Sequence, residues 1–145
     1  MVALALAQLY ICQMKLVVDT SAFLAVVLME PEREWLIDCT VGVEACAPEL
    51  LPYEVGNALS AMIKRGRLDV KQAQAAYRSF TKMAVRLLPC DISTALGLSA
   101  SRNLYAYDAY FLVAARKLDC PLITLDQRLR DTARALGITT LEPNS

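Results

Sequence analysis

Short apolar runs alternate with longer segments in which apolar residues recur at helical spacing along most of this chain. Runs rich in Leu, Val and Ile that stop at a polar residue predict buried strands, whereas recurrence every three to four residues predicts helices. The predicted strands are 16–19, 44–47, 85–88, 121–125 and a last one near 139–141. The predicted helices are 21–29, 32–40, 49–65, 70–83, 92–102, 108–118 and 127–136.

This alternation predicts a parallel sheet, because strands joined by helices run in the same direction and their right-handed crossovers cover both faces. We therefore expect an α/β fold, a three-layer α/β/α sandwich with a central parallel sheet, in a single domain over residues 14–145. The order of the strands within the sheet does not follow from their spacing.

Residues 1–13 form an apolar N-terminal extension of unknown role before the first predicted strand. The extension has no basic start and is shorter than the ~20 apolar residues that span a bilayer, so neither secretion nor a membrane is expected. A misassigned start, an added arm and a helix that packs on a partner all remain open.

The composition narrows the chemistry. No histidine is present among the 145 residues, which excludes Ser-His triads and histidine-ligated zinc. The five cysteines are scattered without a C-x-x-C pair, which favours reduced core residues in a cytoplasmic protein. Fifteen basic residues balance fifteen acidic ones, so nucleic-acid binding would depend on local clusters. A hydrophobic content of 56% predicts an additional buried interface, with a second copy or a protein partner.

Four acids are the candidate catalytic residues: Asp19, Glu54, Asp108 and Asp126. Asp19 and Asp126 each close an apolar run before a helical segment, so in a parallel sheet both would emerge at the edge where open α/β folds bind ligands. Asp108 opens a predicted helix. Helix capping is the ordinary explanation for each Asp taken singly. Glu54 lies inside a predicted helix, beside its buried stripe, and cannot be that helix's cap.

If the four carboxylates converge, their mutual repulsion raises some pKa values unless a cation neutralises them. Oxygen-only ligands favour Mg²⁺ or Mn²⁺, and such an ion would activate water against a phosphoryl group. Nearby side chains that could hold metal-bound waters or a phosphate oxygen, or orient a ligand, are Ser21, Asn57, Thr20 and Thr124. Basic residues near the same edge that could contact a polynucleotide backbone are Arg102, Arg116, Lys117, Arg128 and Arg130.

Four segments resemble a known family when they are taken together in this order and spacing. They read LVVDTSA at 16–22, PYEVGNAL at 52–59, YDAYFLVAA at 107–115 and LITLDQRL at 122–129. The set resembles the PIN-domain ribonucleases, especially the VapC-type toxins. Residues 1–13 lie before the usual family start, and Leu125 stands before Asp126 where many relatives have a small residue.

The resemblance implies a Mg²⁺- or Mn²⁺-dependent endoribonuclease in which Asp19, Glu54, Asp108 and Asp126 bind the metal, with Ser21 and Asn57 assisting. It also implies an RNA substrate, a homodimer, and a cognate antitoxin whose C-terminal segment lies over the active-site groove. The alternative from another class is a non-catalytic PIN-like module that acts only through a protein partner.

Overall fold

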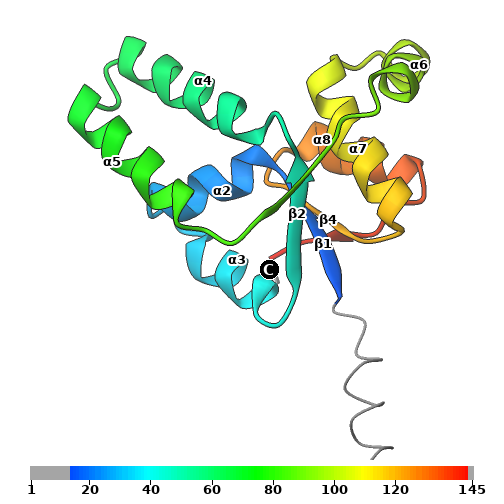
Figure 1. Ribbon diagram of the computed structural model, residues 1–145, viewed down its shortest axis with the longest axis horizontal. Helices are drawn as coiled ribbons and strands as arrows, with labels where there is room; N and C mark the ends of the chain where they lie inside the picture. Colours follow the sequence, from blue (N-terminus) through cyan, green and yellow to red (C-terminus); the bar gives the residue numbers. More distant parts are fainter. Residues whose placement is uncertain (1–13, 144–145) are drawn as a thin grey trace, which may run out of the picture.

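The computed structural model describes residues 14–143, which form a five-stranded parallel sheet with helices on both faces (Figure 1). The strands are β1 (Lys15–Val18), β2 (Glu44–Pro48), β3 (Arg86–Leu88), β4 (Leu122–Ile123) and β5 (Thr140–Leu141). The helices are α2 (Thr20–Val27), α3 (Arg33–Thr40), α4 (Leu51–Lys64), α5 (Val70–Thr81), α6 (Ile92–Arg102), α7 (Ala106–Leu118) and α8 (Gln127–Ala135).

The strand order is β3-β2-β1-β4-β5, and every neighbouring pair is parallel. From β1 the chain moves outward to β2 and β3, and then α6 and α7 carry it back to β4 on the other side of β1. The direction of the connections therefore reverses between β1 and β4. Such a switch point opens a crevice at the carboxyl ends of the two strands, and ligands bind there in open α/β sheets.

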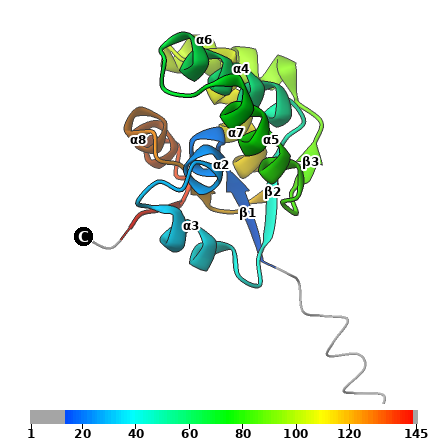
Figure 2. The same ribbon diagram turned by 90° about the vertical axis from the view of Figure 1, so that its left-hand side faces the viewer.

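The central strands are apolar without interruption because helices cover both faces of the sheet. Val17 and Ile123 are fully buried in neighbouring strands. Helix α7 packs against β1, β2 and β4, whereas α2 and α3 line the opposite face, and the arrow of β1 points toward the end of the molecule where α4 and α7 lie (Figure 2).

Helices α4 and α5 form a hairpin that packs on α2 and extends away from the sheet. Leu51, Val55 and Leu59 recur every four residues and bury one side of α4. Gly66 then takes a positive φ of 70°, a conformation that glycine adopts without steric cost after a helix. A capping box between Asp69 and Gln72 starts α5.

The expected α/β class with a central parallel sheet is confirmed. Glu54 lies inside α4 and is not its cap, as expected, but α4 begins at Leu51, later than the predicted start at residue 49, so Glu54 falls in the first turn. Helix α7 begins at Ala106, so Asp108 lies within its first turn and does not open the helix. The expectations for residues 1–13 concern a segment outside the described residues.

The cysteines and the candidate membrane spans can be described for residues 14–143. The cysteines at positions 39, 46, 90 and 120 are free thiols there. No helix within residues 14–143 is long and apolar enough to cross a bilayer.

Candidate functional site

The four acids that the sequence singles out line one cavity of about 500 Å³ at the switch point of the sheet. Asp19 follows β1, Glu54 lies in the first turn of α4, Asp108 in the first turn of α7, and Asp126 caps α8. Each acid therefore comes from a different connection between elements. The other residues that line the cavity are Thr20, Ser21, Leu50, Tyr53, Asn57, Ala58 and Tyr107.

Asp19 is the most deeply placed of the four, with only 7% of its surface exposed. Its Oδ1 accepts a hydrogen bond from the Thr20 amide at 2.7 Å, which makes Asp19 the N-cap of α2. Its Oδ2 accepts bonds from the hydroxyls of Ser21 and Thr124, each at 2.7 Å. Burial raises the pKa of Asp19, and these donors oppose the rise because they stabilise the charged form.

Thr124 supports the cavity from beneath. The register of β1 with β4 pairs Val18 with Ile123, so the residues that follow, Asp19 and Thr124, are also neighbours. Thr124 is 1% exposed, and its hydroxyl accepts the Asp126 amide at 3.0 Å while it donates to Asp19. A single hydroxyl thus connects two of the four acids.

Glu54 and Asp108 are half-buried and face the same cavity. Burial raises the pKa of Glu54, a hydrogen bond from the Thr20 hydroxyl opposes this rise, and the charges of Asp19 and Asp108 add to it. Burial also raises the pKa of Asp108, with further contributions from the charges of Asp19 and Asp126, while Arg128 acts in the opposite direction. The site therefore concentrates negative charge at a cost that a cation would relieve.

Asp126 is exposed, and its Oδ1 accepts the Leu129 amide at 2.9 Å as the N-cap of α8. The capping explanation is therefore correct for Asp19 and Asp126, and in both cases it coexists with a place in the shared cavity. Asn57 is exposed and lines the cavity from α4. The hydroxyls of Ser21 and Thr124 both donate to Asp19, so these two residues orient its carboxylate.

The chemistry of the donors fits a hard divalent cation, because they are carboxylate oxygens with no thiolate or imidazole among them. Within residues 14–143, no group of three or more Asp, Glu or Cys side chains is drawn together closely enough to hold an ion as it stands. Glu54 accepts from Thr20, and Asp126 accepts from Leu129. In each carboxylate the other oxygen, Glu54 Oε1 or Asp126 Oδ2, makes no hydrogen bond within residues 14–143.

Two features of the site were not predicted. Tyr53 lines the cavity and is 83% exposed, and its place in the PYEVGNAL segment beside Glu54 is the signal that could have shown this. Arg130 is one of the basic residues expected to contact a polynucleotide backbone, yet its Nη2 donates to the Thr124 carbonyl at 3.1 Å. Its place four residues after the cap Asp126 is the signal that could have shown this inward direction.

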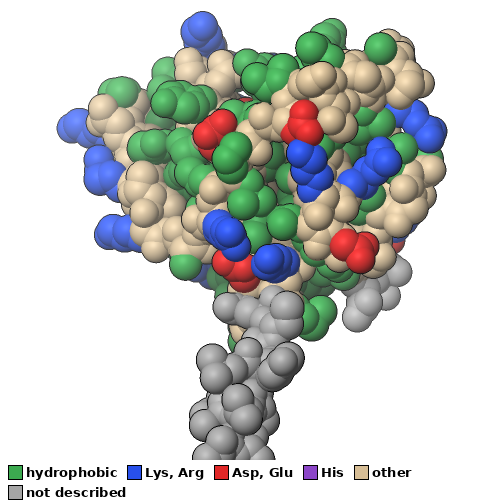
Figure 3. All heavy atoms as spheres, turned by 45° about the vertical axis from the view of Figure 1, so that its right-hand side comes forward, with side chains coloured by type: hydrophobic (Ala, Val, Ile, Leu, Met, Phe, Trp, Pro, Cys, Tyr) green, Lys and Arg blue, Asp and Glu red, His purple; other side chains and the backbone are tan. Residues whose placement is uncertain are grey.

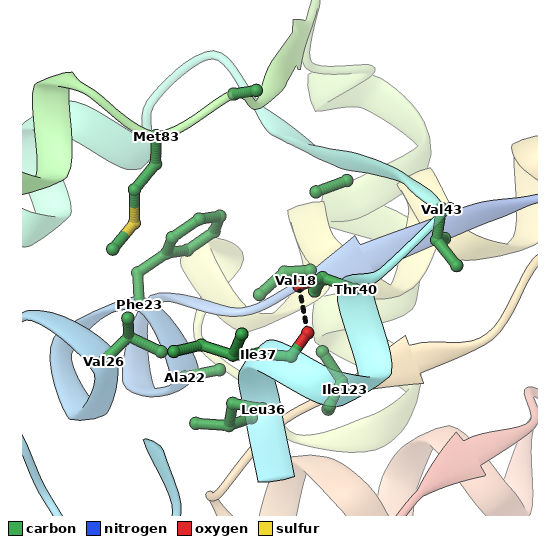
Figure 4. A pocket seen from close by; sticks show the side chains of 12 residues that line it. Val18, Ala22, Phe23, Val26, Leu36, Ile37, Thr40, Val43, Met83 and Ile123 are labelled. Carbon is green, nitrogen blue, oxygen red and sulfur yellow. Dashed lines mark hydrogen bonds between the residues drawn. The ribbon is translucent and has the colours of Figure 1, made fainter. Parts of the chain in front are cut away.

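A second cavity, of about 320 Å³, lies on the opposite side of β1 between α2 and α3 (Figure 4). Phe23, Val26 and Ile37 direct their side chains toward it, and Met83 lies above. The hydroxyl of Thr40 donates to the Ile37 carbonyl at 2.8 Å. No titratable side chain lines this cavity, so it offers no acid-base chemistry.

Positive charge is dispersed over the surface that Figure 3 presents, where Lys and Arg side chains are scattered among apolar groups. Arg128 is the basic residue close enough to Asp108 to lower its pKa. Attraction for a polyanion would therefore depend on a few local contacts and on a cation in the acidic cavity.

The fold and the site together define a parallel α/β domain with an acidic ligand cavity at its topological switch point. Residues 16–135 match the family model described as PIN domain. The chain is 32% identical over 133 residues to Ribonuclease VapC9 of Mycobacterium tuberculosis, an alignment that covers 88% of this chain and 98% of that protein. The chain belongs to the PIN-domain family, and the expected resemblance to VapC-type proteins is confirmed.

Two solved structures show the same fold. The crystal structure of PAE2754 from Pyrobaculum aerophilum superposes with a TM-score of 0.69 at 22% identity, covering 89% of this chain and 90% of that chain. VapBC2 from Rickettsia felis, solved bound to a DNA fragment from their promoter, superposes with a TM-score of 0.62 at 10% identity, covering 88% and 98%.

Proposed function

We propose that this chain is a Mg²⁺- or Mn²⁺-dependent endoribonuclease and the toxin of a toxin–antitoxin pair. The observation that carries the proposal is the meeting of Asp19, Glu54, Asp108 and Asp126, from four separate connections, in one cavity at the switch point. The name and coverage of the VapC9 relative support the same activity.

In this proposal the four carboxylates hold the cation, and the other polar side chains orient them. A bound Mg²⁺ or Mn²⁺ supplies an activated water and polarises a phosphoryl oxygen. Ser21 and Thr124 fix the direction of the Asp19 carboxylate, which lines the cavity, through their two hydrogen bonds to Oδ2. Asn57 and Ser21 line the same cavity, and in this proposal they contact an RNA phosphate.

Proton transfer in this site is the work of carboxylates, since the chain has no histidine. A carboxylate with a raised pKa is a better proton acceptor near neutral pH than an ordinary one. Burial and neighbouring charges raise the pKa of both Glu54 and Asp108, which lie on the cavity wall. A divalent cation held by these two carboxylates would lower both pKa values, so either group would serve as a proton acceptor only where it does not ligate the cation.

A cognate antitoxin that covers the cavity is part of the proposal, as is a homodimer. The fold similarity to VapBC2 agrees with a protein partner. The α4–α5 hairpin beside the site carries partly exposed apolar side chains around a groove of about 460 Å³, among them Ile63, Val70 and Tyr77. Such a surface suits an apolar segment of a partner.

A non-catalytic binding module is the competing function. It is favoured by one observation: within residues 14–143, the acidic side chains of the cavity are not drawn together as a group of three or more that could hold an ion. The two functions differ in whether RNA is cleaved, so a single assay separates them.

The test is incubation of the purified, partner-free chain with end-labelled total RNA in Mg²⁺, Mn²⁺ or EDTA, beside Asp108→Asn. We expect cleavage that requires the metal and disappears in the variant, whose fold is verified by circular dichroism. Intact RNA in every lane, with an active control nuclease in parallel, would favour the binding module.

A further inference from the structure

Arg130 is a mostly buried cation on α8 whose guanidinium bonds to Thr124, Gln127 and Glu142 and to none of the four acids. Its side chain is 13% exposed. Its Nη2 donates to the Thr124 carbonyl at 3.1 Å, and its Nη1 donates to Gln127 Oε1 at 3.1 Å and to Glu142 Oε1 at 3.0 Å. With both terminal nitrogens engaged in this way, Arg130 is poorly placed to bind a phosphate.

Both the backbone carbonyl and the side-chain hydroxyl of Thr124 make hydrogen bonds. Its backbone carbonyl accepts from Arg130, while its hydroxyl donates to Asp19 and accepts from the Asp126 amide. Because the carbonyl and the hydroxyl belong to one buried residue, fixing the carbonyl also fixes the point from which the hydroxyl reaches Asp19. The Arg130 side chain is therefore linked to Asp19 and to the Asp126 amide through one intervening residue, Thr124.

Glu142 holds the guanidinium from the C-terminal side. Its Oε1 contacts Arg134 Nη2 at 2.6 Å as well as Arg130, and the hydrogen bonds from Arg134 and Arg130 lower the pKa of Glu142. Arg134 also donates to the Thr140 hydroxyl of β5 at 3.0 Å, which ties the carboxylate to the sheet. Glu142, which follows β5, thus restrains the side chain of Arg130.

The Nε of Arg130 is buried without a hydrogen-bond partner among the described residues. Burying an arginine with an unpaired nitrogen costs desolvation free energy. A hydrophobic side chain of similar size would pack there without that penalty. What the arginine adds is a directed bond to the one carbonyl that locates Thr124.

We propose that Arg130, held by Glu142, is a positioning residue that fixes Thr124 and through it the relative placement of Asp19 and Asp126. This inference rests on the proposed function for its catalytic meaning, but the positioning itself is a structural property. Residues that orient metal ligands from behind affect metal affinity by about 10- to 100-fold when they are replaced.

The experiment compares Arg130→Met with Arg134→Met. Both variants remove an arginine from α8 that contacts Glu142, but only the first removes a bond to Thr124. Three quantities are measured: amide hydrogen exchange, Mn²⁺ affinity from thermal shift, and cleavage of RNA by the folded fraction. Glu142→Gln is a milder third variant that leaves the arginine in place.

In Arg130→Met we expect faster exchange at the amides of Leu125 and Asp126 than at Leu112, a core residue that reports global unfolding. Mn²⁺ affinity and cleavage should fall by about tenfold or more. Arg134→Met should change the three quantities by less than twofold after correction for stability, and Glu142→Gln should give an intermediate result.

The proposal is overturned if Arg130→Met keeps wild-type exchange at these two amides, or if Arg134→Met disturbs them equally. If Arg130→Met does not fold, Glu142→Gln decides the matter alone, and unchanged exchange there rejects the inference. A wild-type chain that neither binds Mn²⁺ nor cleaves RNA refutes the proposed function, whereas the exchange comparison still tests the positioning.

Discussion

Asp19 and Thr124 lie 105 residues apart in the chain, and Thr124 Oγ1 donates to Asp19 Oδ2 at 2.7 Å. The bond exists because β1 and β4 are adjacent parallel strands whose register places these two residues side by side. It holds a nearly buried carboxylate at the base of the acidic cavity.

Thr124→Val tests how much this hydroxyl stabilises the protein. Valine keeps the shape but leaves Asp19 without one donor and the Asp126 amide without its acceptor. We expect the free energy of unfolding in urea to fall by about 1–3 kcal/mol. The matched control is Thr81→Val, an exposed hydroxyl bonded to its own helix, which should cost no more than about 0.5 kcal/mol. Equal losses in both variants would contradict the role of Thr124.

Asp108→Asn should stabilise the metal-free protein at neutral pH. Burial and the charges of Asp19 and Asp126 raise the pKa of Asp108, so the folded state prefers its neutral form. The charged group therefore lowers wild-type stability at high pH, and this deficit disappears as the pH falls through the folded pKa. Urea unfolding in EDTA at several pH values should show the variant's advantage shrinking toward acid. A variant that is less stable than the wild type at neutral pH would refute this.

The charge of Asp91 should have the opposite effect on stability from that of Asp108. Its carboxylate contacts Lys117 Nζ at 2.6 Å and caps α6, and these bonds lower the pKa of Asp91 to about 2. The stabilisation is complete above the ordinary value of 3.8 and is lost as the pH falls toward 2. Lys117→Met should therefore be less stable than the wild type at pH 5, with the two curves converging in strong acid. If the difference in unfolding free energy between the two proteins does not change with pH, the ion pair between Asp91 and Lys117 does not contribute to stability.

Divalent cations should stabilise the wild-type chain by mass action. At a concentration 100 times the Kd the expected gain is about 2.7 kcal/mol, which corresponds to a rise of several degrees in Tm. Asp19→Asn should abolish the rise, because Asp19 lies at the centre of the cluster. Asp91→Asn should retain it, since Asp91 does not line the cavity. The same response in both variants would indicate non-specific binding.

Tyr53→Ala tests the aromatic rim of the cavity under the proposed function. Tyr53 is 83% exposed, so its removal should leave Tm unchanged. A stacked base contributes about 1–3 kcal/mol to binding of unpaired RNA, so KM should rise more than kcat falls. Tyr105→Ala is the control, because Tyr105 is similarly exposed at 80% but does not line the cavity. Equal effects at both positions would argue against stacking at Tyr53.

The sequence by itself determined the elements and three features of the site. Continuous apolar runs fixed β1 and β4, because strands covered on both faces need no polar alternation. Asp19 and Asp126 had to follow those strands, and helical spacing placed Glu54 beside the core of α4. The absence of histidine excluded imidazole ligands and left carboxylates as the main candidates.

Only the tertiary structure decided that β1 and β4 are neighbours and that the connections reverse between them. Spacing along a chain carries no information about which strands pair, since pairing depends on how whole helices pack across the sheet. The Thr124–Asp19 bond, the inward direction of Arg130 and the place of Tyr53 on the rim all follow from that packing. Local sequence thus determines which residues end each strand, whereas long-range packing determines which of those ends meet.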